Sequence, residues 1–91
     1  SGIIYGLTSA MMGEITVKNG EVVKSNFHDY PAMRIQQVPE IEVVILENNP
    51  RITGVGEPGT PPSIPALANA IFAATGKRIR ELPMNKHIDF A

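Results

Sequence analysis

The sequence predicts an α+β fold in which two helices pack on a small, mainly antiparallel sheet that includes a β-hairpin. Two stretches, residues 3–13 and 64–75, carry apolar residues at helical spacing. Between them, residues 14–25 and 40–47 are rich in β-branched side chains. The order helix, hairpin, strand, helix leaves too few crossover connections for a parallel α/β design.

The bulk composition describes one small and nearly neutral domain. The 91 residues are expected to form a single domain, residues 1–91, with one modest core, because a chain of this size buries roughly 60–70% of its unfolded surface. Eight basic and nine acidic residues give a net charge of −1, which argues against a nucleic-acid partner. Cysteine is absent, which excludes disulfides and cysteine-ligated metal centres within this chain. No apolar run approaches the roughly 20 residues of a membrane span.

The first helix is expected at residues 3–13, and its apolar arc is wider than one stripe. Tyr5, Met12 and Ile15 broaden the arc, so the helix is either a core helix or packs on something beyond its own domain. The sequence has no initiator methionine and enters the helix almost at once. We therefore expect the chain to be a piece of a larger polypeptide.

A hairpin is the clearest local signal. Asn19-Gly20 lies between two β-prone runs within residues 14–25, and this dipeptide favours a two-residue type I′ turn. That turn would place Val17 opposite Val22 across the ladder. The sequence predicts structure here and no chemistry.

The proline-bounded connection at residues 26–39 contains an adjacent His28 and Asp29. An acid–base pair is one interpretation, but no serine or cysteine nucleophile is spaced to join it. A metal site would need more ligands, and His87 is distant in sequence, so no metal ligand is predicted. We favour a structural role in which these polar groups bond the loop backbone, with Arg34 pairing to Asp29 or to a carbonyl.

Residues 40–47 are expected to form a strand that leads into a glycine-rich loop. The run alternates at first and then becomes continuously apolar, which suits a strand buried on both faces at its centre. Such a strand would hold the following loop firmly.

The loop Gly54-Val55-Gly56-Glu57-Pro58-Gly59, called the glycine loop below, is the strongest candidate for chemistry. Its glycines allow close backbone approach to a ligand, and Glu57 is a potential general base. Composition alone favours the alternative of a surface turn with a solvated glutamate. The spacing also matches the dinucleotide fingerprint, which we reject because Glu57 would repel a pyrophosphate and Pro58 lacks an amide donor. We further expect the next helix to begin several residues after the loop.

The second helix is expected at residues 64–75. Ser63 is a good N-cap and Pro65 is tolerated in the first turn. Gly76 suits the position just after the last turn. The four basic residues that follow are expected to be solvated or to dock an acidic partner.

Three stretches make the chain similar to a known family. They are the glycine loop, residues 65–83 from Pro65-Ala66-Leu67 to Glu81-Leu82-Pro83, and Asn26-Phe27-His28-Asp29-Tyr30-Pro31 with Arg34. Through these stretches and their order along the chain, the sequence resembles the C-terminal end of the molybdopterin-binding large subunit of the xanthine dehydrogenase/aldehyde oxidase family. The likeness is to the isoquinoline oxidoreductase beta-subunit and aldehyde dehydrogenase type, and it spans nearly the whole chain.

The resemblance implies a catalytic role for Glu57 in an oxidoreductase acting on aldehydes or N-heterocycles. In the family this glutamate is the general base that takes the proton of a molybdenum-bound hydroxyl, and hydride then passes to a sulfido ligand. By the same resemblance, Gly54, Val55 and Gly56 line the pocket of a molybdenum–pterin cofactor, in its cytosine dinucleotide form. The implied partners are the remainder of the large subunit and an iron–sulfur subunit.

The same resemblance implies that this piece works only inside the whole subunit. The pterin-binding segments precede it in the family, so the fragment alone is expected to bind no cofactor and to be inactive. One alternative is a stand-alone binding or assembly module with an exposed apolar face on residues 3–13. Another is a structural domain with a solvated Glu57. The compartment, bacterial cytoplasm or periplasm, stays open.

Overall fold

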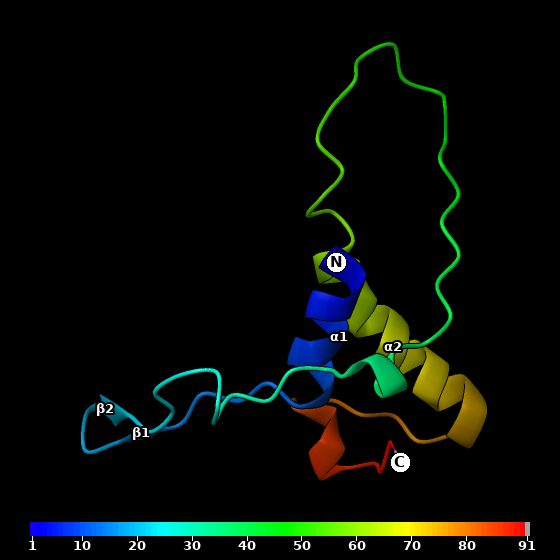
Figure 1. Ribbon diagram of the computed structural model, residues 1–91. Coiled ribbons are helices and arrows are strands. Elements are labelled where there is room, and N and C mark those ends of the chain that lie inside the picture. Colours follow the sequence, from blue (N-terminus) through cyan, green and yellow to red (C-terminus); the bar gives the residue numbers. More distant parts are fainter. Residues whose placement is uncertain (91) are drawn as a thin grey trace.

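The computed structural model describes residues 1–90 and confirms the α+β class (Figure 1). Two α-helices and one two-stranded antiparallel hairpin are joined by long coil segments. In chain order the elements are α1 (Gly2–Met11), β1 (Val17–Lys18), β2 (Glu21–Val22), the 3₁₀ helix η1 (Ile35–Gln37), α2 (Thr60–Thr75) and the 3₁₀ helix η2 (Met84–Lys86).

The two helices pack directly against each other, with α1 along α2 in Figure 1. Gly6 of α1 lies where the first turn of α2 approaches. A Cβ built at Gly6 would come within 2.1 Å of the Ser63 Oγ and 2.5 Å of the Thr60 carbonyl oxygen. Only a residue without a side chain fits at that distance. The Thr60 hydroxyl also donates to the Gly2 carbonyl at 3.0 Å, which ties the two helix starts together.

The core lies at the other end of the helix pair, where the C-terminal segment folds back under it (Figure 1). Its buried members are Ala10 from α1, Ile71 from α2, and Ile79 and Met84 from the C-terminal segment. Partly buried apolar side chains surround them: Ile64, Leu67, Ala68, Ile88 and Phe90. The core therefore joins three segments that are distant in sequence.

Basic residues after α2 bond within the chain. Arg78 donates to the Asn69 side chain at 2.7 Å and lies 4.0 Å above the Phe72 ring. The Lys77 ammonium donates to the His87 carbonyl, and Lys86 pairs with Glu14. These contacts attach the C-terminal segment to the helices.

The hairpin forms as its turn predicts. Val17 is opposite Val22 and Lys18 is opposite Glu21. Asn19 and Gly20 have φ values of 52° and 79°, the left-handed pair that a type I′ turn requires. The hairpin lies away from the helix pair in Figure 1, and its strand residues are exposed.

The strand expected at residues 40–47 does not form, and that prediction is wrong. These residues belong to a long exposed excursion, residues 40–58, that leaves the helix pair and returns to it (Figure 1). Val43 is 71% and Ile45 80% exposed, although burial on both faces was expected. A strand needs a neighbour, and the two strands formed within residues 1–90 pair with each other.

The start of the second helix also differs from the prediction. α2 begins at Thr60 with Gly59 as its N-cap, so Ser63 is not the cap and the helix opens directly after the glycine loop. Pro61 and Pro62 fit the first turn because amides there need no intrahelical partner. The Ser63 hydroxyl instead donates to the Thr60 carbonyl at 2.7 Å. At the other end Gly76 takes the predicted left-handed conformation, with φ of 73°.

The helix contact yields a test with Gly6→Ala. The added methyl would overlap backbone and side-chain oxygens of α2, and overpacking of this kind costs typically 1–3 kcal/mol. We expect a net loss of about 1–2 kcal/mol in the free energy of unfolding, because alanine returns up to about 1 kcal/mol of helix propensity. Urea unfolding measures it.

Gly54→Ala is the matched control, since nothing lies within 4 Å of its built Cβ. Equal stability of the two variants would show that the close approach at Gly6 is not a constraint on the fold.

Candidate functional site

The glycine loop ends at the junction between the exposed excursion and α2. The Glu57 carbonyl accepts the Thr60 amide at 3.0 Å, which turns the chain into the helix. Sequence and structure therefore agree that a helix follows Glu57, and the structure places it closer to Glu57 than expected.

The start of α1 holds the C-terminal half of the loop. A Cβ built on Gly2 would come within 2.7 Å of the Gly56 carbonyl oxygen, and one built on Gly59 within 3.2 Å of Ile3 Cγ1. The other half is open, because nothing lies within 4 Å of a Cβ built on Gly54. The loop is thus fixed at one end and uncovered at the other.

Three of the four predicted site residues line one pocket. Gly54, Gly56 and Glu57, together with Pro58, surround about 320 Å³ of space. Val55, the fourth, is 86% exposed beside it. The Glu57 carboxylate is exposed and takes part in no hydrogen bond or ion pair within residues 1–90. An unpaired carboxylate is available to accept a proton.

The Glu57 carboxylate suits a general base, and the backbone at Gly54 and Gly56 suits contacts to a bulky group. The open space at Gly54 and Gly56 leaves the loop backbone accessible, as close approach of a cofactor would require. Across residues 1–90, no group of three or more His, Cys, Asp or Glu side chains is placed to hold a metal ion.

His28 and Asp29 lie together, but the carboxylate is engaged by its own loop. Asp29 accepts the Ser25 amide at 2.9 Å and the Asn26 amide at 3.1 Å, whereas His28 Nε2 is 3.8 Å away. The backbone hydrogen bonds from Ser25 and Asn26 lower the Asp29 pKa from its ordinary 3.8. This geometry agrees with the structural role favoured above. The Arg34 amide bonds the Gln37 side chain at 2.9 Å.

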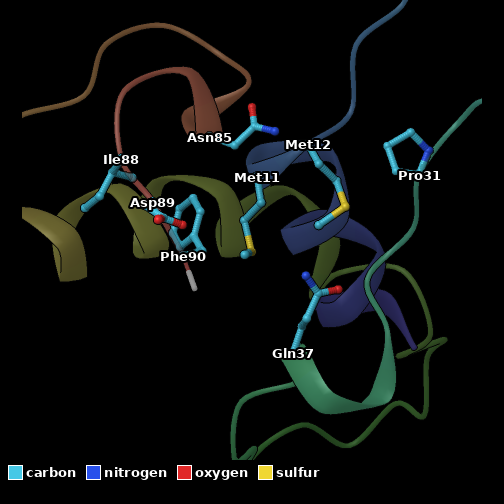
Figure 2. A pocket seen from close by; sticks show the side chains of 8 residues that line it. All are labelled: Met11, Met12, Pro31, Gln37, Asn85, Ile88, Asp89 and Phe90. Carbon is cyan, nitrogen blue, oxygen red and sulfur yellow. The ribbon is translucent and has the colours of Figure 1, made fainter.

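A second pocket, missed by sequence reasoning, opens at the far end of α1 (Figure 2). It encloses about 480 Å³. Its lining residues are Met11, Met12, Pro31, Gln37, Asn85, Ile88, Asp89 and Phe90. The ten residues of α1 separate it from the glycine loop, a distance of about 15 Å. The adjacent methionines that end α1 are the one sequence signal that points to it.

The chain is similar in sequence to a short segment of much longer known proteins. It is 45% identical over 83 residues to the isoquinoline 1-oxidoreductase subunit beta of Brevundimonas diminuta, covering 91% of this chain and 11% of the relative. It is 32% identical over 87 residues to the aldehyde oxidoreductase molybdenum-binding subunit of Escherichia coli strain K12, covering 87% of this chain and 12% of that subunit.

A third relative carries a different cofactor in its name. The chain is 36% identical over 81 residues to the membrane-bound aldehyde dehydrogenase [pyrroloquinoline-quinone] of Gluconacetobacter polyoxogenes, covering 89% of this chain and 10% of the relative. The chain thus spans about a tenth of the length of these proteins. No family model matches the chain. No solved structure matches it either. None of the helices within residues 1–90 has the length and apolar character needed to cross a bilayer.

The Asp29 contacts predict a pH-dependent loop. A lowered pKa means that the loop contacts are stabilised above the ordinary value of 3.8 and are lost as the pH falls through the lower, folded-state pKa. We expect the Ser25 and Asn26 amide NMR shifts to titrate together with a midpoint below 3.8.

Asp29→Asn should abolish that titration, and Glu21→Gln in the neighbouring hairpin should leave it unchanged. A midpoint at or above the ordinary value would contradict the hydrogen-bonded geometry.

Proposed function

Because the chain is homologous to a segment of the molybdenum-binding subunits of the xanthine dehydrogenase and aldehyde oxidoreductase family, we propose that it is the C-terminal part of such a subunit and supplies the active-site base, Glu57. The observation that carries the proposal is the unpaired Glu57 carboxylate on a loop that both helix starts anchor. The whole subunit would be an oxidoreductase that acts on an aldehyde or an N-heterocycle.

The anchored backbone around Glu57 supports its proposed role as a general base. Effective proton transfer needs a carboxylate in a fixed place and within hydrogen-bond reach of the proton. The Thr60 amide and the packing of Gly2 on Gly56 fix the backbone next to Glu57. The carboxylate itself remains available, because no cation or donor within residues 1–90 engages it.

Gly54, Val55 and Gly56 are proposed to contact the cofactor through their backbone. With no Cβ at two of the three positions, a large planar group can lie against the chain. When bound, a molybdenum–pterin cofactor supplies the metal centre for substrate oxidation, and we propose its cytosine dinucleotide form. We propose that residues in the remainder of the large subunit hold the rest of this cofactor. Electrons would leave through an iron–sulfur subunit.

The remainder of the subunit has a further task. Glu57 is exposed in this chain, whereas tuning of a catalytic carboxyl depends on desolvation by surrounding protein. Burial of the glycine loop must therefore come from residues outside these 91. On this account the isolated chain is inactive and binds no cofactor.

A stand-alone binding module with an exposed apolar face on residues 3–13 is the alternative, and the half-buried Ile3 and Ile4 of α1 line apolar grooves on that helix. On α1, Leu7, Ala10 and Met11 are buried, and Tyr5 is the markedly exposed apolar side chain. Exposed apolar side chains also lie on the excursion and around the hairpin.

Glu57→Gln in the full-length enzyme tests the proposal. The amide keeps the shape of the side chain but cannot accept the proton, so turnover should fall by about 10²–10⁴-fold. Molybdenum content, measured by elemental analysis, should stay at the wild-type level, because Glu57 is not proposed as a ligand.

Glu47→Gln is the matched control, since Glu47 is an exposed carboxylate on the same excursion. Wild-type turnover in Glu57→Gln would refute the role of base. A quinone in place of molybdenum in the purified wild-type enzyme would refute the cofactor assignment alone.

A further inference from the structure

Residues 41–46, Ile41-Glu42-Val43-Val44-Ile45-Leu46, are a run with five apolar side chains that the rest of residues 1–90 leaves uncovered. Four consecutive side chains, from Val43 to Leu46, are 71–80% exposed. The run lies on the outward path of the excursion in Figure 1 and belongs to no helix or strand. Its backbone amides and carbonyls form no hydrogen bond within residues 1–90.

Such a segment is unusual in a chain that is complete in itself. Loops longer than about 12–15 residues without secondary structure are uncommon in compact domains. A flat, β-branched run with free backbone groups is a template for strand pairing. The two ends of the excursion are fixed, because Pro39 and Gly59 both line one groove on the α1–α2 pair. Only the middle lacks a partner.

The side-chain pattern indicates a strand with cover on both faces. In an extended chain Ile41, Val43 and Ile45 point to one side, and Glu42, Val44 and Leu46 point to the other, so both faces are apolar from Val43 onward. Such two-sided apolarity is typical of strands inside a sheet that is covered above and below. Residues 1–90 contribute no second layer here, since the strands of the hairpin pair with each other.

We propose that residues 41–46 form a β-strand that joins a sheet in the remainder of the large subunit. The proposal rests on the proposed function only in that the chain is part of that subunit, and not on the role of Glu57. The remainder of such a subunit is large enough to provide a sheet, because about nine-tenths of the relatives' length lies outside the part that this chain matches. A sheet edge in that remainder, with apolar layers on both faces, has the chemistry that this segment requires.

Charge disfavours a second copy of the chain as the occupant. An antiparallel pair centred on Val43 and Val44 would place Glu40 opposite Glu47. A parallel, in-register pair would stack each glutamate on its own copy. Like charges directly opposite each other destabilise a strand pair.

The strand would also hold the N-terminal end of the glycine loop in place. The helix starts hold the loop after Gly56, and the strand would hold the chain that enters it before Gly54. Glu57 would then be fixed from both directions.

Amide hydrogen exchange of the full-length subunit, read by mass spectrometry, tests the proposal. Peptides that cover residues 43–46 should exchange about 100-fold or more slower than unprotected amides. The protection should persist on dilution to concentrations at which the subunit is monomeric by light scattering. Rapid exchange would overturn the proposal, and so would protection that vanishes on dilution, because that result indicates pairing between copies.

A matched set of proline variants locates the pairing. Val43→Pro and Val44→Pro remove adjacent amides that face opposite edges of a strand, so at least one should abolish the protection. Ile52→Pro, at a fully exposed position of the same excursion, should preserve it. If all three variants kept the protection, strand pairing at this segment would be refuted. Rapid exchange of residues 43–46 together with an inactive Glu57→Gln enzyme, or protection together with an active one, separates this proposal from the catalytic one.

Discussion

The close approach of α1 to the first turn of α2 is the constraint on which the rest of the structure depends. Gly6 admits the Thr60 carbonyl and the Ser63 hydroxyl at distances that no side chain tolerates. The hydrogen bond from Thr60 to the Gly2 carbonyl then aligns the two helix starts. One end of this pair anchors the glycine loop, and the other end carries the core. A change in the crossing would therefore move Glu57 and the core together.

Several large apolar side chains of the chain are exposed, which is unusual for a self-sufficient domain. Its buried core is small, while the run from Val43 to Leu46 is exposed. Full burial of an aliphatic side chain contributes about 1.5–3 kcal/mol, so these four side chains offer several kcal/mol to any surface that covers them. On the proposed function, the coil-rich excursion and the exposed Glu57 share one explanation, because the remainder of the subunit would cover both.

Local signals in the sequence predicted local structure well. Asn19-Gly20 determines its turn through two positive φ values, and Gly76 ends α2 through one. The strand expected at residues 40–47 does not form because pairing depends on a neighbour, and the two strands within residues 1–90 pair with each other. α2 begins earlier than the sequence predicts because Pro61 and Pro62 suit a first turn. Glycine spacing located Glu57, whereas its anchorage through Gly2 and Gly6 depends on tertiary packing that periodicity does not reveal.

An experimental structure of the full-length subunit with its cofactor bound would test the proposed role of this chain most directly. The distance to measure runs from the Glu57 carboxylate to the nearest atom of the cofactor or its bound substrate. We expect hydrogen-bond reach, about 2.6–3.2 Å directly or through one water, with Gly54 and Gly56 against the cofactor. A Glu57 carboxylate that remains in solvent, far from the cofactor, would contradict the account.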